Sequence, residues 1–133
     1  MSFFDTSFII DLLREQRRGI DGGSHKKLRQ LDETPVQLSC FVVCELEAGA
    51  ALHHGQEEHQ RVRRVCEQFE IVYPDERFAS VYGATLAELK RQRITVATME
   101  LLIGVQALVE NDTLITRNLR HFQKIPNLRV EDY

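Results

Sequence analysis

The stretch Phe3-Phe4-Asp5-Thr6-Ser7-Phe8-Ile9-Ile10-Asp11-Leu12-Leu13 decides the fold, because it passes from a strand pattern to a helix pattern within a few residues. The two phenylalanines predict a very short apolar strand that ends at Asp5. Ser7 can cap a helix over about residues 8–17, in which the apolar positions recur on one face. A short strand that leads directly into a helix is the repeating unit of an α/β protein.

The rest of the chain repeats this alternation. Further strands are predicted over residues 36–40, 71–73, 113–116 and 128–130, and further helices around residues 28–31 and over about 41–53, 57–69, 78–91 and 98–109. The last of these helices, capped by Thr98, is apolar nearly all round and should be the most buried. Short strands that alternate with helices imply right-handed crossovers and a mainly parallel sheet. We therefore expect a three-layer α/β/α sandwich in a single domain over residues 1–133.

Composition excludes several classes of protein. The chain has 133 residues, of which 43% are hydrophobic and 28% are charged, as in a soluble globular protein rather than a disordered or fibrous one. A net charge of −3 argues against a protein that grips nucleic acid with its whole surface, although a local basic rim remains compatible with it.

No apolar run approaches the roughly 18 residues of a membrane span, and Asp5 interrupts any signal peptide, so we expect no membrane contact and a cytoplasmic location. An odd set of three cysteines indicates buried, reduced thiols: Cys40, Cys44 and Cys66.

Acidic residues from three distant segments follow predicted strands or begin predicted helices. Asp5 follows the first strand, Glu45 lies in the first turns of the helix after the second strand, and Glu100 lies in the first turn of the helix at Thr98. In open α/β sheets the carboxyl ends of the strands form the ligand-binding edge. Carboxylates gathered there raise each other's pKa unless a cation joins them. Oxygen ligands suit Mg²⁺ or Mn²⁺, which promote phosphodiester hydrolysis.

Each acid also has a purely structural explanation. Glu100 could be favoured by the helix dipole alone, and Asp5 could simply end a turn or cap a helix. Spacing by itself therefore leaves both interpretations open.

Four segments of the sequence together resemble the motifs of PIN-domain nucleases, and above all of the VapC-like toxin ribonucleases of type II toxin-antitoxin systems. The segments are Phe4-Asp5-Thr6-Ser7-Phe8-Ile9-Ile10-Asp11-Leu12-Leu13, Ser39 with Glu45-Leu46-Glu47-Ala48-Gly49, Thr98-Met99-Glu100-Leu101-Leu102-Ile103-Gly104, and Thr116-Arg117-Asn118-Leu119-Arg120-His121-Phe122. The closing residues 125–133 are similar to the tail of the same proteins. The resemblance runs through the whole chain in order.

This resemblance implies a Mg²⁺- or Mn²⁺-dependent ribonuclease that cuts RNA, with tRNA as one candidate substrate. It also implies a homodimer and a cognate antitoxin that places a peptide in the acidic site. Asp5, Glu45 and Glu100 would be the catalytic and metal-binding acids. Residues expected to support the site or contact RNA are Thr6, Ser7, Thr116, Arg117, Asn118 and Arg120.

Two positions depart from the family pattern. Glu100 stands where the third acid is usually Asp, and His121 takes the fourth position, which is usually also Asp. The longer side chain moves its oxygens outward, which an octahedral Mg²⁺ site tolerates poorly, and imidazole suits softer ions. We therefore expect a weakened site, or one shifted toward Mn²⁺.

Two other functions compete with an active ribonuclease. A degenerate PIN domain would have weak or no nuclease activity and act as an antitoxin- or RNA-binding module. A phosphoryl-transfer enzyme with Asp5 as nucleophile is disfavoured, because such phosphatases need a second Asp at position 7, where this chain has Ser.

Overall fold

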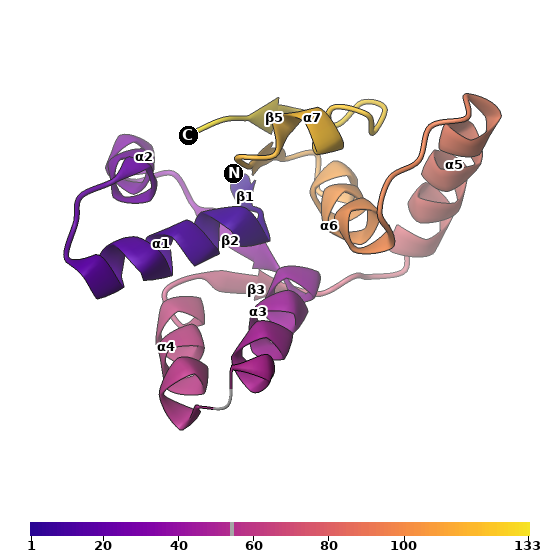
Figure 1. Ribbon diagram of the computed structural model, residues 1–133. Helices are drawn as coiled ribbons and strands as arrows, with labels where there is room; N and C mark the ends of the chain where they lie inside the picture. Colours follow the sequence, from indigo (N-terminus) through magenta and orange to yellow (C-terminus); the bar gives the residue numbers. More distant parts are fainter. Residues whose placement is uncertain (54) are drawn as a thin grey trace.

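The computed structural model describes residues 1–53 and 55–133, and its centre is a five-stranded sheet with the order β3-β2-β1-β4-β5 (Figure 1). The strands are β1 (Ser2–Phe4), β2 (Val36–Ser39), β3 (Glu70–Val72), β4 (Thr113–Ile115) and β5 (Val130–Glu131). The helices are α1 (Thr6–Arg18), α2 (Gly23–Leu31), α3 (Cys40–Leu52), α4 (Gln56–Cys66), α5 (Phe78–Arg91), α6 (Thr98–Val109) and α7 (Leu119–Phe122).

Every strand pairing in the sheet is parallel, so the sheet is wholly rather than mainly parallel. Helix α1 lies against α2, α3 and α4, while α6 lies against α3, α5 and α7 (Figure 1). Helices thus cover the sheet on both faces, which confirms the predicted three-layer α/β/α sandwich.

The strand order places β1 at the middle of the sheet. It pairs with β2 through Ser2 and Val36 and with β4 through Phe3 and Leu114. The chain therefore extends the sheet first on one side of β1 and later on the other. Ligands bind at such a reversal, beyond the carboxyl ends of the strands, and this is where Asp5 lies.

Aromatic packing holds the junction between β1 and α1 in place. The rings of Phe4 and Phe8 stack with centroids 3.7 Å apart, and Phe69 meets Phe4 edge-on at 5.6 Å. Phe4 and Phe8 are fully buried. Because Asp5 lies between two buried rings along the chain, its backbone has a fixed position in the core.

The predicted helix caps are partly wrong. Helix α1 begins at Thr6, one residue before Ser7, so the Ser7 hydroxyl lies inside the helix and donates to Asp5 instead of capping. Helix α6 has Ala97 at its N-cap position, and Thr98 is its first residue. Ser39 caps α3, since its hydroxyl oxygen accepts the Phe41 backbone N–H at 3.1 Å.

The bounds of some helices and the burial of the cysteines also differ from the prediction. Helix α4 ends at Cys66, before the predicted residue 69, and the four-residue helix α7 is too short to show a periodic pattern. Cys44 is exposed rather than buried, because it lies on the outer side of α3, while Cys40 and Cys66 are half-buried and all three are free. None of the described helices is long and apolar enough to cross a membrane.

Candidate active site

Asp5 is a buried carboxylate at the end of the central strand. Its exposed fraction is 4%, and its Oδ2 accepts hydrogen bonds from the Thr116 hydroxyl at 2.8 Å and the Ser7 hydroxyl at 2.9 Å. Burial raises the pKa of Asp5, and the hydroxyls of Thr116 and Ser7 offset only part of that effect. The side chain therefore has one orientation and an incompletely compensated negative charge when it ionises.

Glu45 comes to this position from α3. The Thr6 hydroxyl donates to Glu45 Oε1 at 2.7 Å, and Thr6 is the residue that follows Asp5. The first two predicted acids, 40 positions apart in the sequence, thus meet through one threonine. Glu45 is exposed, so its second oxygen is accessible to solvent or to a ligand.

Glu100 and His121 form a second linked pair. Glu100 lies in the first turn of α6, and its Oε1 is 2.8 Å from His121 Nδ1 on α7. The side chain at the fourth family position is therefore engaged with the third acid instead of adding a carboxylate.

The residues after β4 connect the strand to α1. Asn118 donates its backbone N–H to Thr116 Oγ1 at 2.9 Å, which orients the hydroxyl that binds Asp5. Arg117 extends to Asp11, with its Nη1 2.7 and 2.8 Å from the two carboxylate oxygens. Arg120 is exposed on α7. Thr116 and Asn118 thus support the site directly, while Arg117 is already held by a residue that the sequence did not single out.

Asp11 is the functional candidate that sequence reasoning missed, together with its second partner Tyr133. The available signal for Asp11 was its position one helical turn after Ser7, which places both side chains on the same face of α1. No sequence pattern links Tyr133 to either residue.

Across residues 1–53 and 55–133, no group of three or more His, Cys, Asp or Glu side chains is close enough to hold a metal ion. The acids instead fall into the Asp5–Thr6–Glu45 set and the Glu100–His121 pair. Their donors are mainly carboxylate oxygens, which fit a hard divalent cation such as Mg²⁺ or Mn²⁺. The buried charge of Asp5 is the feature that such a cation would compensate.

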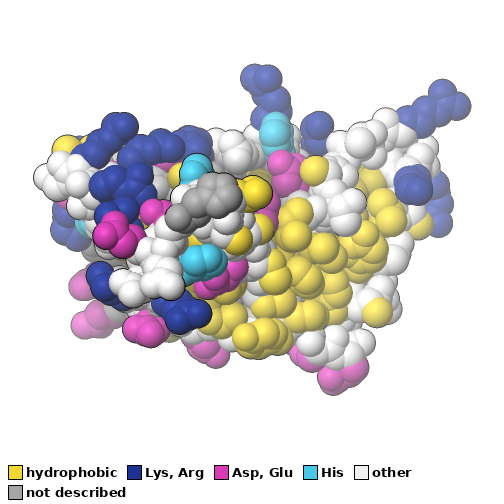
Figure 2. Space-filling model, turned by 60° about the horizontal axis from the view of Figure 1, so that its bottom comes forward, with side chains coloured by type: hydrophobic (Ala, Val, Ile, Leu, Met, Phe, Trp, Pro, Cys, Tyr) yellow, Lys and Arg dark blue, Asp and Glu magenta, His cyan; other side chains and the backbone are white. Residues whose placement is uncertain are grey.

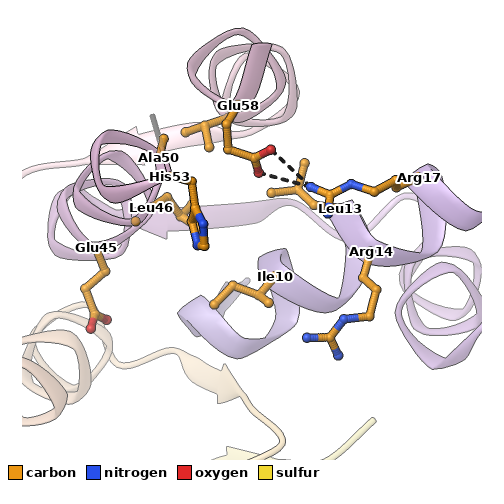
Figure 3. Close-up of a pocket in the computed structure, with 11 residues that line it drawn as sticks. Ile10, Leu13, Arg14, Arg17, Glu45, Leu46, Ala50, His53 and Glu58 are labelled. Carbon is orange, nitrogen blue, oxygen red and sulfur yellow. Dashed lines mark hydrogen bonds and ion pairs between the residues drawn. The ribbon is translucent and has the colours of Figure 1, made fainter. Parts of the chain in front are cut away.

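A groove begins at Glu45 and runs between α1, α3 and α4 (Figure 3). Its volume is about 260 Å³, and apolar side chains of α1 and α3 form much of its lining. An ion pair between Arg17 and Glu58, at 3.0 Å, joins α1 to α4 across it. The residues that line the groove are Ile10, Leu13, Arg14, Arg17, Glu45, Leu46, Gly49, Ala50, His53, Glu58 and Val62.

Known proteins share this sequence pattern. A family model described as PIN domain matches residues 2–128. Ribonuclease VapC2 of Rickettsia felis (strain ATCC VR-1525 / URRWXCal2) is 29% identical over 99 residues, which are 74% of each chain. Ribonuclease VapC1 of Haemophilus influenzae (strain R2866) is 28% identical over 130 residues, which cover 97% of this chain and 95% of that protein.

Solved structures share the fold. The structure of VapBC-1 from nontypeable Haemophilus influenzae contains a chain that is 27% identical, with a TM-score of 0.84 and coverage of 98% of this chain and 96% of that one. VapBC2 from Rickettsia felis, bound to a DNA fragment from its promoter, contains a chain with a TM-score of 0.89 at 23% identity, covering 99% and 98% of the two chains. The latter likeness shows the fold alone.

Proposed function

The chain belongs to the PIN domain family, and from this premise we propose that it is a VapC-like ribonuclease that hydrolyses RNA phosphodiester bonds. The observation that carries the proposal is Asp5. This carboxylate is buried at the switch point of a parallel sheet, is oriented by two hydroxyl donors, and has Glu45 beside it through Thr6. The curated relatives named ribonuclease VapC support the same activity.

The proposed site residues have two roles: some would bind the cation, and others orient those that bind it. Asp5, Glu45 and Glu100 would hold Mg²⁺ or Mn²⁺, which when bound supplies charge neutralisation at the phosphoryl group and a more acidic attacking water. Thr116 and Ser7 keep Asp5 in one orientation, and Thr6 does the same for Glu45. Pre-oriented ligands lose little entropy when the cation and RNA arrive.

The two positions that differ from the family pattern, Glu100 and His121, should affect which cation the site binds. Glu100 is already hydrogen-bonded to His121, so a cation must compete with the imidazole for that carboxylate. We expect weaker Mg²⁺ binding than Mn²⁺ binding, measured by calorimetric titration with each ion. Equal, tight affinity and equal activity with the two ions would show that the substitutions do not alter the site.

The decisive assay is cleavage of total tRNA and a panel of synthetic RNAs, with Mg²⁺ and then Mn²⁺. Asp5→Asn and Glu45→Gln should abolish cleavage, and Glu33→Gln, an exposed acid elsewhere, should leave it unchanged. Loss of cleavage by at least about a hundredfold in both acid variants is expected for ligands of the reacting site. No cleavage by the wild-type protein, with no metal binding, would favour a degenerate domain that only binds an antitoxin or RNA.

The groove beside Glu45 is where we place a segment of an antitoxin partner. Solved structures of VapBC pairs support such a partner, and the groove offers an apolar floor that leads to the acidic site. Gly49 lines the groove, and a Cβ added there meets no atom within 4 Å, so Gly49→Leu adds a side chain at a point where the groove is open. Gly83 has the same open surroundings on α5 and supplies the matched control Gly83→Leu.

Both glycine variants should stabilise their helices by up to about 1 kcal/mol. Only Gly49→Leu should weaken capture of the cognate antitoxin in co-purification, with RNA cleavage retained. Equal antitoxin capture by both variants would show that the groove is not part of the antitoxin interface.

A homodimer is the expected assembly. Figure 2 shows a broad apolar area that is nearly free of charge, of the kind that marks an association surface. A hollow of about 270 Å³ between α5 and the start of α6 has polar and apolar walls, and its apolar lining includes Tyr82, Leu86, Ile94 and Val96. Light scattering coupled to gel filtration should give twice the chain mass, and a monomer at tens of micromolar would refute it.

A further inference from the structure

Tyr133 is linked to the acidic site through contacts with Asp11 and Arg117. Its ring meets Phe8 edge-on, with centroids 4.8 Å apart, and its hydroxyl donates to Asp11 Oδ2 at 2.6 Å. Phe8 is fully buried and stacked on Phe4. The ring contact therefore sets where the hydroxyl lies, and the hydroxyl contacts a residue 122 positions earlier in the sequence.

Asp11 is shared between Tyr133 and Arg117. The side chain of Asp11 is 13% exposed, and its two oxygens lie 2.7 and 2.8 Å from Arg117 Nη1. Arg14 Nη1 lies farther away, 3.3 Å from Oδ1. Because a phenol and a guanidinium bind the same carboxylate, the phenol restricts the orientation in which that carboxylate holds the arginine.

The backbone of Arg117, in turn, lies next to the hydrogen bonds that Asp5 accepts. Its backbone N–H donates to Ser7 Oγ at 3.4 Å, and the Ser7 hydroxyl donates to Asp5. The Arg117 side chain is 51% exposed and uses Nη1 on Asp11, while its Nε and Nη2 make no hydrogen bond with the residues that the structure describes. A guanidinium with free donors, on a residue whose backbone adjoins the acidic site, is suited to bind a phosphate.

We propose that Tyr133 is a positioning residue that, through Asp11, holds the guanidinium of Arg117 in place for a phosphate of the RNA substrate. This inference rests on the proposed ribonuclease function. Tyr133 itself touches no reacting atom, so it acts only through the orientation of Arg117.

Tyr133→Phe removes the hydroxyl and keeps the ring against Phe8. The Asp11 carboxylate then loses one of its partners, and Arg117 regains side-chain freedom that must be lost again when phosphate binds. Ordering a long side chain on binding weakens affinity by about two- to tenfold. A contact made equally to bound substrate and transition state affects KM and leaves kcat unchanged. We therefore expect KM to rise by that factor.

The experiment compares four proteins with the wild type: Tyr133→Phe, Arg117→Gln, the double variant, and Tyr73→Phe as a control with an exposed tyrosine. Three quantities are measured. The first is the kinetics of RNA cleavage, and the second is the salt dependence of binding to a 2′-O-methyl RNA oligonucleotide. The third is the ¹⁵N relaxation of Arg117 Nε, which needs neither RNA nor metal.

Support consists of three results. Arg117 Nε becomes more mobile in Tyr133→Phe and not in Tyr73→Phe. The salt slope of RNA binding stays near the wild-type value in Tyr133→Phe, in which Arg117 still reaches the phosphate, while Arg117→Gln lacks about 0.7 of a slope unit for one lost phosphate contact. The double variant is no worse than Arg117→Gln, because both changes act on one contact.

Two results overturn the inference. Unchanged Arg117 relaxation in Tyr133→Phe shows that the hydroxyl does not hold the arginine, and fully additive effects on KM show that the two residues act separately. A wild-type protein that neither binds nor cleaves RNA overturns the proposed function and with it the role of Arg117 toward phosphate. The relaxation measurement still decides whether Tyr133 orients Arg117 in that case.

Discussion

Replacement of Glu15 by glutamine tests how a single buried carboxylate holds α2 against α1. The Glu15 side chain reaches the start of α2, where its Oε1 accepts the backbone N–H groups of Gly22 at 3.0 Å and His25 at 3.1 Å, and its Oε2 accepts that of Ser24 at 3.1 Å. His25 Nδ1 lies 2.7 Å from Oε1. The carboxylate thus caps a helix from another element, at the end where the helix dipole favours an anion.

The cost of the substitution follows from these contacts. Glutamine keeps one oxygen for the donors at Oε1 but turns an NH₂ group toward the N–H of Ser24, which is fully buried. One buried donor left without an acceptor costs about 1–3 kcal/mol. Loss of the anion at the helix N-terminus adds about 0.3–1 kcal/mol. Glu15→Gln should therefore lower the free energy of unfolding by about 1–4 kcal/mol, and Tm by about 5–14 °C.

The same variant should change the response to acid. Burial alone raises the pKa of Glu15, but hydrogen bonds from His25 and Ser24 outweigh it, so the pKa lies below its usual value of 4.5. A carboxyl with a lowered pKa stabilises the fold above its unfolded pKa, and that stability is lost as pH falls through the folded pKa. Glu15→Gln removes this contribution, so its unfolding free energy should depend less on pH below about 5.

Urea unfolding at pH 7 and at acid pH measures both effects. Glu33→Gln is the control, because Glu33 is exposed and an exposed substitution usually changes stability by less than about 0.5 kcal/mol. If Glu15→Gln stayed within 0.5 kcal/mol of the wild type at pH 7, the cap would contribute little and the reasoning would be wrong. Identical acid sensitivity in the two proteins would exclude Glu15 as the source of the pH dependence.

Three further predictions concern the site and the core. Thr116→Val removes a hydroxyl that donates to Asp5, so it should raise the pKa of Asp5 further and weaken Mn²⁺ binding near neutral pH; unchanged affinity by calorimetry would contradict this. His121→Asp places a second carboxylate beside Glu100, so without metal it should lower Tm through repulsion, and with saturating Mg²⁺ it should gain more Tm than the wild type does. Phe122→Ala empties a fully buried position and should cost about 3–5 kcal/mol in urea unfolding; a loss below 1 kcal/mol would show that α7 repacks.

Local patterns in the sequence determined the order and type of most elements. Helix periodicity predicted α5 over residues 78–91 with the bounds that the structure has, and short apolar runs predicted all five strands within a few residues. Parallel pairing followed because strands separated by helices must cross over in one direction. The acids Asp5, Glu45 and Glu100 were found because each follows a strand or lies in the first turns of a helix.

Only the tertiary structure decided what these acids touch. Thr6 binds Glu45 from 39 positions away, and Thr116 binds Asp5 from 111 positions away. Tyr133 reaches Asp11 across nearly the whole chain. A periodic pattern reports which face of an element is buried, because that depends on neighbours a turn away. The partner of a polar side chain depends on how separate elements pack, and so the pairing of His121 with Glu100 and the link from Tyr133 to Arg117 became visible only when the sheet brought their elements together.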